Sequence, residues 1–303
     1  MDNVLITGAT GFLGSNFINE NSHHYNNIYA ITRGNVFTKK NVIYCKLDLN
    51  NSQDLNHFIK QKQIDVIIHF AFDHTYNNNI KMIKSISNAA IKNNIKKNVL
   101  ISSISVLKIN NNKIDFEYNK KNDPYSFTKR KVEKIFLRIN KGLNNIKIIY
   151  PTIVYGEGGN WNKFINKCLN SESFSLPHKG EVKCNFIYVD NFSKKLQAEI
   201  YNDTIKKIIG GVNGKWIDLY DMLNKSNNSL NISKTQNLYH DNFIINLVMI
   251  VWQKTKLGVI ANLLLSFYLK NKKTNKKSSQ SEKISHTSPI FSNREIHNSN
   301  FEI

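Results

Sequence analysis

A tyrosine and a lysine four positions apart are the residues of this chain best suited to proton chemistry. Tyr125 and Lys129 belong to the segment Tyr125-Ser126-Phe127-Thr128-Lys129, which opens a predicted helix that continues through Glu133. Residues four apart lie on one face of a helix, one turn from each other. A nearby ammonium stabilises a phenolate, so we expect Lys129 to lower the pKa of Tyr125 and let it exchange a proton near neutral pH. An isolated pair of this kind is common on helix surfaces, so other parts of the chain must support the assignment.

A glycine-rich turn near the start of the chain predicts a site for a pyrophosphate. Gly8, Gly11 and Gly14 are spaced three apart, directly after the apolar run Val4–Thr7 and before a helix-like segment. Glycines in a strand-to-helix turn let the backbone bend tightly and let a bulky anion approach. The following helix offers free N–H groups and the positive end of its dipole. The spacing G-x-x-G-x-x-G differs from the standard dinucleotide fingerprint G-x-G-x-x-G, and a purely structural turn is the alternative.

Short apolar runs alternate with longer segments of helical spacing, which is typical of a parallel α/β fold. The predicted strands are Val4–Thr7, Ile28–Thr32, Val42–Lys46, Val66–Phe70, Val99–Ser102 and Ile146–Tyr150, and the covering helices include Asp54–Lys62 and Ile80–Asn93. Near-continuous apolar runs suit strands buried on both faces. Right-handed connections between them give a doubly wound sheet, whose ligands bind outside the carboxyl ends of the strands. The glycine turn, Asp48, His69, Ser103 and Pro151 all fall at or near such ends.

The composition indicates a globular protein with a large positive charge. The chain has 303 residues, enough for one nucleotide-binding domain and a smaller region, and a formal net charge of +20. Lysine and asparagine recur throughout instead of forming a basic and aromatic stripe, so we expect no nucleic-acid partner. The positive field favours an anionic small substrate such as a nucleotide diphosphate.

The cysteines indicate a reducing compartment. Cys45, Cys168 and Cys184 are scattered, with no C-x-x-C pair, so we expect a cytoplasmic protein without a metal site. The first predicted strand begins at Val4, so we also expect no signal peptide.

In this order the motifs resemble those of the NAD-dependent epimerase/dehydratase family, part of the extended short-chain dehydrogenase/reductase superfamily, which works on nucleotide sugars. The similarity runs collinearly from residue 1 to about residue 220. The segments that carry it are Thr7–Gly14, Asp48-Leu49, Val66–Ala71, Ile101–Val106, Tyr125–Lys129, Pro151–Gly156 and Phe186–Asn191.

The resemblance implies a role for each matching residue. It implies cofactor contacts from Gly8, Thr10, Gly11, Phe12, Leu13 and Gly14 in the glycine turn, from Asp48 and Leu49 at the adenine, and from Phe70, Ala71 and Pro151. It makes Ser103 the hydroxyl partner of Tyr125, and it makes Tyr125 and Lys129 the catalytic pair, which also contacts the cofactor. It makes Asn79 a structural residue at the start of a helix.

The chain departs from the family pattern in ways that bear on the reaction. Phe72 stands where a second alanine is usual, and Tyr150 replaces the arginine before the proline. Ile104 and Ser105 follow Ser103, where the 4,6-dehydratases of the family carry an acidic pair and the sugar-acid decarboxylases carry a glutamate. Water elimination and decarboxylation need that extra acid–base group, so we expect neither reaction. A ketosugar reductase and a 4-epimerase remain.

The end of the second predicted strand bears on the choice of cofactor. An NAD site usually has a carboxylate there for the ribose hydroxyls, whereas an arginine accommodates a 2′-phosphate. Here Thr32 and Arg33 stand at that place, with Lys39 and Lys40 close behind. Because arginine matches phosphate in geometry and charge, we expect NADP in preference to NAD, with a solvated arginine as the alternative.

We expect residues 1–150 to form an NAD(P)-binding domain with a Rossmann-type sheet, joined by returning elements from 151–220. Residues 151–270 would form a smaller substrate-binding region, and 271–303 a basic, partly disordered tail. The apolar segments Phe243–Trp252 and Leu257–Leu269 are shorter than the ~20 residues that a membrane span needs. Two helices that complete the substrate region are expected there, with a peripheral membrane anchor as the alternative. The sequence leaves open whether the chain forms a homodimer.

Two functional hypotheses of different classes follow. The first is a nucleotide-sugar enzyme that supplies a surface polysaccharide, with ketosugar reduction preferred and 4-epimerisation as the alternative. The second is a non-catalytic NAD(P)-binding protein that senses redox state. The complete set of Ser103, Tyr125 and Lys129 favours the enzyme, because a sensor has no need of all three.

Overall fold

The central element of the fold is an eight-stranded sheet in the order β14-β9-β6-β5-β1-β2-β4-β3. The computed structural model describes residues 1–110, 113–119, 123–169, 173–176, 183–210, 217–218 and 231–234. The strands of the sheet are β1 (Asn3–Thr7), β2 (Asn27–Ile31), β3 (Phe37–Lys39), β4 (Val42–Cys45), β5 (Val66–His69), β6 (Lys97–Ile101), β9 (Ile146–Pro151) and β14 (Lys206–Ile209). Neighbouring strands pair in parallel, except that β3 runs antiparallel to β4 at the edge.

The inner strands confirm the prediction from the apolar runs. All six predicted strands are present, each within two residues of the expected bounds. The residues of β5 and β9 are buried throughout, which is the pattern of strands covered on both faces. The sequence did not predict β3, which is short and exposed, or β14, which begins with two lysines.

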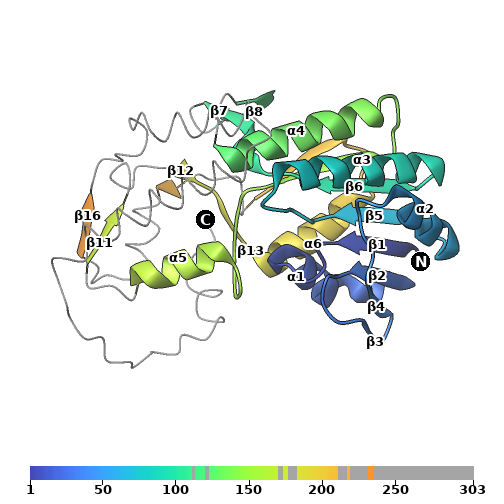
Figure 1. Ribbon diagram of the computed structural model, residues 1–303. Coiled ribbons are helices and arrows are strands. Elements are labelled where there is room, and N and C mark those ends of the chain that lie inside the picture. Colours follow the sequence, from blue (N-terminus) through green and yellow to red (C-terminus); the bar gives the residue numbers. More distant parts are fainter. Residues whose placement is uncertain are drawn as a thin grey trace.

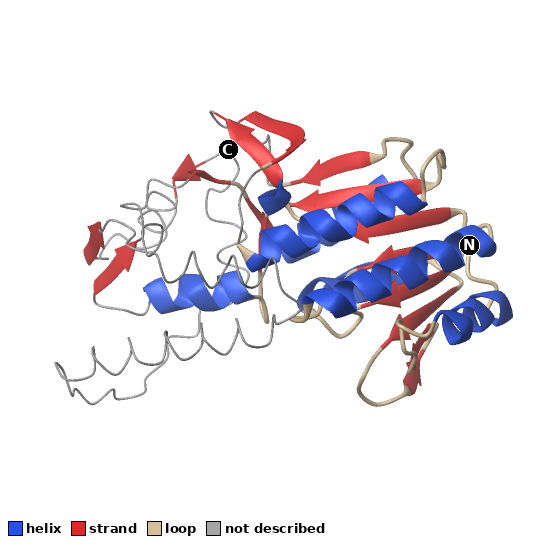
Figure 2. Ribbon diagram, turned by 45° about the horizontal axis from the view of Figure 1, so that its top comes forward, coloured by secondary structure: helices blue, strands red, loops and turns tan. Residues whose placement is uncertain are grey.

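Helices cover both faces of the sheet, so the α/β fold with a doubly wound parallel sheet is confirmed (Figure 1). Helices α1 (Phe12–Asn21) and α6 (Val189–Ile200) pack on one face. Helices α2 (Ser52–Gln61), α3 (Tyr76–Lys92) and α4 (Pro124–Ile139) pack on the other, where the long helices cross in front of the strands (Figure 2).

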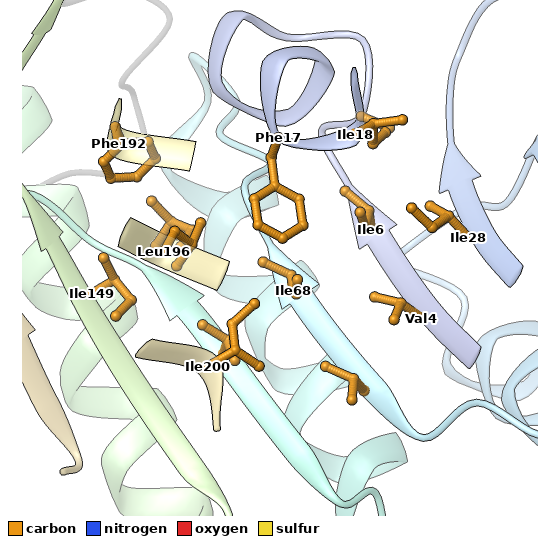
Figure 3. Packing of buried hydrophobic residues seen from close by; sticks show 14 of the residues in the cluster. Val4, Ile6, Phe17, Ile18, Ile28, Ile68, Ile149, Phe192, Leu196 and Ile200 are labelled. Atoms are coloured by element: carbon orange, nitrogen blue, oxygen red, sulfur yellow. The ribbon is translucent and has the colours of Figure 1, made fainter. Parts of the chain in front are cut away.

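Alternation along β1 divides the core into two layers. Val4 and Ile6 point toward α1 and α6, where they meet Phe17, Phe192, Leu196 and Ile200 (Figure 3). Leu5, between them, points to the opposite face and joins the cluster that α2 and α3 cover. Successive side chains of a strand point to opposite faces, so the consecutive apolar residues 4–6 of β1 serve both layers.

The order of the strands places a switch point between β1 and β5. From β1 the chain moves to β2 and β4 on one side, and from β5 it moves to β6, β9 and β14 on the other side. The loops that leave β1 and β5 therefore diverge and open a crevice outside their carboxyl ends, where doubly wound sheets bind ligands.

A hairpin separates β6 from α4. The 3-10 helix η2 (Ile104–Val106) follows β6, and β7 (Leu107–Asn110) then pairs antiparallel with β8 (Lys113–Tyr118). Asn119, just after β8, donates from its side chain to the carbonyl oxygens of Ser105 and Leu107. The hairpin is thereby tied to the loop that carries Ser103.

The later part of the chain forms small pairs of strands and returns to the sheet. β10 (Ile153–Tyr155) pairs with β13 (Phe186–Tyr188), β11 (Ser173–Leu176) with β16 (Asn231–Lys234), and β12 (Lys183–Cys184) with β15 (Ile217–Asp218), while α5 (Asn160–Leu169) follows β10 (Figure 1). α6 and β14 then rejoin the main sheet.

The described residues include no helix long and apolar enough to cross a membrane. The segments Phe243–Trp252 and Leu257–Leu269 and the tail 271–303 lie outside the described residues.

Candidate active site

The glycine turn after β1 packs against the loop after β5. Gly8 has a φ of +68°, and a Cβ at this position would lie 2.7 Å from the backbone nitrogen of Ala71. A Cβ at Gly14 would collide with the carbonyl oxygen of Gly8. Gly8 and Gly14 are therefore required by the close approach of backbone to backbone.

The amino end of α1 fits a pyrophosphate. The helix begins at Phe12 after Gly11, no side chain caps it, and its first turn holds no acidic residue. Thr10 and Gly11 are exposed, whereas Phe12 and Leu13 are partly buried against the core. Apolar side chains thus anchor the turn while its uncapped N–H groups and dipole face the crevice, an arrangement that favours an anion.

The ends of β1 and β5 are joined by a buried hydrogen-bond cluster. The hydroxyl of Thr7 lies 2.6 Å from Nδ1 of His69 and accepts a hydrogen bond from the backbone N–H of Ala71 at 3.3 Å. Complete burial lowers the pKa of His69 to about 3, so its ring is neutral. His69 therefore shapes its strand end and cannot supply a proton at neutral pH.

Asn79 holds the loop that follows β5, in the structural role that the resemblance implied. Its side chain accepts from the backbone N–H of Asp73 at 2.9 Å and donates to the carbonyl oxygens of Asp73 and Thr75 at 2.7 and 2.9 Å. Phe70, at the start of this loop, packs against Phe17 of α1 with ring centroids 5.8 Å apart. The loop is therefore fixed at both of its ends.

Ser103, Tyr125 and Lys129 come together where β6 ends and α4 begins. Asp123 caps α4 by accepting from the backbone N–H of Ser126 at 2.8 Å, which places Tyr125 in the first turn. The hydroxyl of Tyr125 hydrogen-bonds the side chain of Ser103. Lys129 is buried, and its Nζ donates to the carbonyl oxygen of Ile101 at 2.9 Å. Residues that are distant in the sequence thus form one cluster at the carboxyl edge.

The expectation that Lys129 lowers the pKa of Tyr125 is wrong for this structure. Tyr125 is 43% exposed, but desolvation still raises its pKa, and the hydrogen bond to Ser103 only opposes this effect. Burial also lowers the pKa of Lys129, to about 8, against the attraction of Glu133. Desolvation outweighs the interaction between the pair, because Lys129 Nζ lies 6.0 Å from the centre of the Tyr125 ring and bonds to Ile101 instead.

Phe72 packs against both members of the pair. Its ring meets that of Tyr125 edge to face, with centroids 5.1 Å apart, and Lys129 Nζ lies 5.0 Å from the centre of the Phe72 ring. The sequence has a phenylalanine where the family pattern has an alanine, but the motif alone does not predict that Phe72 packs against Tyr125 and Lys129.

Arg33 stands at the other side of the switch point, after β2. Its side chain is 95% exposed, and Nη1 lies 3.8 Å from a carboxylate oxygen of Asp73 in the loop after β5. Thr32 beside it is buried and accepts from the backbone N–H of Gly34 at 2.9 Å. An exposed ion pair of this length is weak, so Arg33 is free to meet another anion.

The remaining candidate residues also lie at carboxyl ends of strands. Asp48 accepts from the backbone N–H of Asn50 at 2.9 Å in the turn after β4, and Leu49 is buried in the core. Pro151 is buried at the end of β9, beside β14. Within the described residues, no group of three or more histidine, cysteine or acidic side chains could hold a metal ion.

The sequence of residues 4–197, more than half of the chain, matches the profile of the NAD dependent epimerase/dehydratase family. The protein belongs to this family. The uncharacterized protein MJ1055 of Methanocaldococcus jannaschii is 27% identical over 254 residues, which cover 72% of this chain and 77% of that protein.

Two solved structures have a similar fold. The dTDP-glucose 4,6-dehydratase of Bacillus anthracis, in complex with NAD, has a TM-score of 0.64 and 19% identity, covering 78% of this chain and 86% of that chain. The UDP-N-acetylglucosamine 4-epimerase of Bacillus cereus has a TM-score of 0.60 and 21% identity, covering 78% and 89%. At these identities the similarity establishes the Rossmann-type fold.

Proposed function

We propose that this protein is an NAD(P)-dependent oxidoreductase that acts on a nucleotide sugar. The observation that carries the proposal is the meeting of Ser103, Tyr125 and Lys129 at the carboxyl edge of the sheet that also bears the glycine turn. Family membership supports it, and two proteins of similar fold act on nucleotide sugars by their names.

The residues of the glycine turn would hold a nicotinamide dinucleotide at its pyrophosphate. Arg33, Asp48 and Leu49 would lie toward its adenine half. Phe70, Ala71 and Pro151 would lie along the carboxyl edge of the sheet. When bound, this cofactor supplies hydride transfer to or from a sugar carbon. The uncapped amino end of α1 fits its pyrophosphate. The chain's own residues would then donate or accept the proton that accompanies hydride transfer.

Tyr125 would exchange that proton at its phenolic oxygen, with Ser103 orienting it. Burial raises the pKa of Tyr125, so the phenol is protonated at neutral pH and is ready to donate to the carbonyl oxygen of a ketosugar. Lys129, one turn along the same helix, would add a positive charge near the phenolate, but in the ligand-free chain it does not offset the effect of burial on the pKa of Tyr125. Donation of this proton would accompany hydride transfer to the carbonyl carbon, and we propose a ketosugar reductase.

The residues after Ser103 support the same choice. Ile104 and Ser105 form η2 and place no carboxylate directly after Ser103. Neither elimination of water nor loss of carbon dioxide would then have its acid–base group. 4-Epimerisation is the second candidate, because it needs hydride and proton transfer alone and because the Bacillus cereus protein of similar fold is a 4-epimerase.

We propose NADP as the preferred cofactor, since the exposed Arg33 is available for a 2′-phosphate. We also propose a substrate-binding region within 151–270 and a cytoplasmic role in the synthesis of a surface polysaccharide.

Native mass spectrometry of the purified protein tests the binding part of the proposal. We expect the chain to carry, or to take up when added, NADP more tightly than NAD. A folded chain that takes up neither dinucleotide contradicts the proposed function, and tighter binding of NAD contradicts the role given to Arg33.

A further inference from the structure

Glu133 is a fully buried carboxylate that the proposed mechanism does not use. It lies on α4 one turn beyond Lys129, and none of its surface is exposed. A buried carboxylate is costly unless hydrogen bonds and an opposite charge compensate the lost water. Its surroundings therefore show what it does in the fold.

Three hydroxyl groups converge on the two oxygens of Glu133. Ser102 donates to Oε2 at 3.0 Å, and Tyr118 and Tyr150 donate to Oε1 at 2.9 and 2.5 Å. These donors come from the end of β6, from β8 and from β9. These hydrogen bonds replace the water that the carboxylate loses on burial, and through them Glu133 joins three elements to the helix that carries Tyr125.

Two residues of α4 hold successive residues at the end of β6. Lys129 donates to the carbonyl oxygen of Ile101, and Glu133 accepts from the side chain of Ser102. Ser103 comes next in the chain and bonds Tyr125 in the first turn of the same helix. Two contacts one helical turn apart thus hold α4 against the end of β6, next to Ser103.

Glu133 is also the charge that faces Lys129. Its attraction raises the pKa of that amine against the effect of burial. His69 from β5 couples to Lys129 but is neutral, and the other groups around Glu133 are the hydroxyls of Ser102, Tyr118 and Tyr150. Tyr150 is neutral where the family pattern has an arginine, so the charge of Glu133 is not shared with a second cation at that position.

We propose that Glu133 is a positioning residue of the active site, which fixes Ser103 through Ser102 and keeps the buried Lys129 charged. The link to catalysis rests on the proposed function. The hydrogen bonds of Glu133 themselves do not rest on it.

Glu133→Gln tests the effect of the charge, since it keeps the size of the side chain and removes its ionisation. With lysines labelled with 13C, the signal of Lys129 is assigned by its loss in Lys129→Met and titrated by NMR in the ligand-free protein. We expect the pKa of Lys129 to fall by about one unit in Glu133→Gln. The matched control is Glu199→Gln on α6, a partly buried glutamate 2.9 Å from Lys207, which should leave the pKa of Lys129 unchanged.

Ser102→Ala tests the positioning effect and serves also if Glu133→Gln fails to fold. It removes the link to β6 and leaves the charge of Glu133 in place. We expect the pKa of Lys129 to stay as in the wild type, while kcat falls about tenfold or more and KM is retained.

The outcomes separate this inference from the proposed function. An equal pKa of Lys129 in the wild type and Glu133→Gln overturns the role of the charge, whatever the enzyme does. An unchanged kcat in Ser102→Ala overturns the positioning role. A wild type that reduces no nucleotide sugar contradicts the proposed function, while a lowered pKa of Lys129 in Glu133→Gln would still support the pairing of the two residues.

Discussion

Desolvation moves the pKa values of Tyr125 and Lys129, both on α4, in opposite directions. The raised pKa of Tyr125 keeps a proton on the phenol. The lowered pKa of Lys129, about 8, still leaves most of the amine charged at neutral pH. A protonated phenol next to an ammonium suits the donation of a proton to a carbonyl oxygen.

Tyr125→Phe should remove most of the turnover and leave dinucleotide binding intact. The ring and its packing against Phe72 remain, and only the hydroxyl that would exchange the proton is removed. Loss of one positioned acid–base group costs about 100- to 10,000-fold in rate. Tyr201→Phe is the control, because its hydroxyl is bound to Asp2 away from the site. Turnover near the wild-type level in Tyr125→Phe would remove Tyr125 from the mechanism.

Lys129→Met should change how stability depends on pH. The pKa of Lys129 is about 8 in the fold against 10.5 for a free lysine, so between these values the unfolded chain binds more protons. The buried amine therefore contributes a rise in the free energy of unfolding as pH increases through this window. We expect the stability of the variant relative to the wild type to fall by on the order of 2 kcal/mol from about pH 7 to about pH 10. Urea unfolding at both pH values measures the free energy of unfolding of the variant and the wild type. The same difference between them at both pH values would contradict a lowered pKa of Lys129.

Arg33→Ala should weaken NADP binding much more than NAD binding. The substitution removes the guanidinium that would pair with the 2′-phosphate, a group that NAD lacks. Fluorescence titration with both dinucleotides gives the two affinities. Arg138→Ala, an arginine in the last turn of α4, should change neither. Equal losses of affinity for both dinucleotides would make Arg33 a general surface charge.

At the scale of elements, the apolar runs predict the inner strands because these strands must be buried on both faces. The same signal fails for β14, whose first two residues are lysines, and for the hairpin of β7 and β8 in a polar stretch. Motif order predicts which residues meet at the carboxyl edge. It does not predict the role of Glu133, because the hydrogen bonds from Tyr118 and Tyr150 that bury this residue come from distant strands. Nor does it predict the raised pKa of Tyr125, which depends on burial.

Gly8→Ala should disrupt the turn between β1 and α1. The new Cβ would meet the backbone of Ala71, and the φ of +68° is strained for alanine. We expect a loss of stability greater than the ~1 kcal/mol of strain alone, together with loss of dinucleotide binding. Gly142→Ala is a matched control, because its φ of +83° is strained in the same way but nothing lies within 4 Å of its Cβ. Comparable stability losses in the two variants would contradict the contact between the loops.

At the scale of the whole molecule, the switch point between β1 and β5 brings the separate motifs to one crevice. The glycine turn and Arg33 lie on one side of it, and Ser103, Tyr125 and Lys129 lie on the other. The net charge of +20 adds a positive field, which favours the approach of an anionic substrate. The architecture thus joins the proposed pyrophosphate site to the proposed proton-transfer site across the middle of one sheet.

The most direct test of the central claim is incubation of the protein with a panel of nucleotide sugars and nucleotide-linked ketosugars. Cofactor absorbance and product mass would be followed together, with NADPH and NADH in the assays. We expect consumption of reduced cofactor and a product heavier than the ketosugar by the two hydrogens added. An isomer of equal mass without net cofactor consumption would instead identify a 4-epimerase. Loss of water or carbon dioxide, or no turnover of any compound, would contradict the proposed reduction.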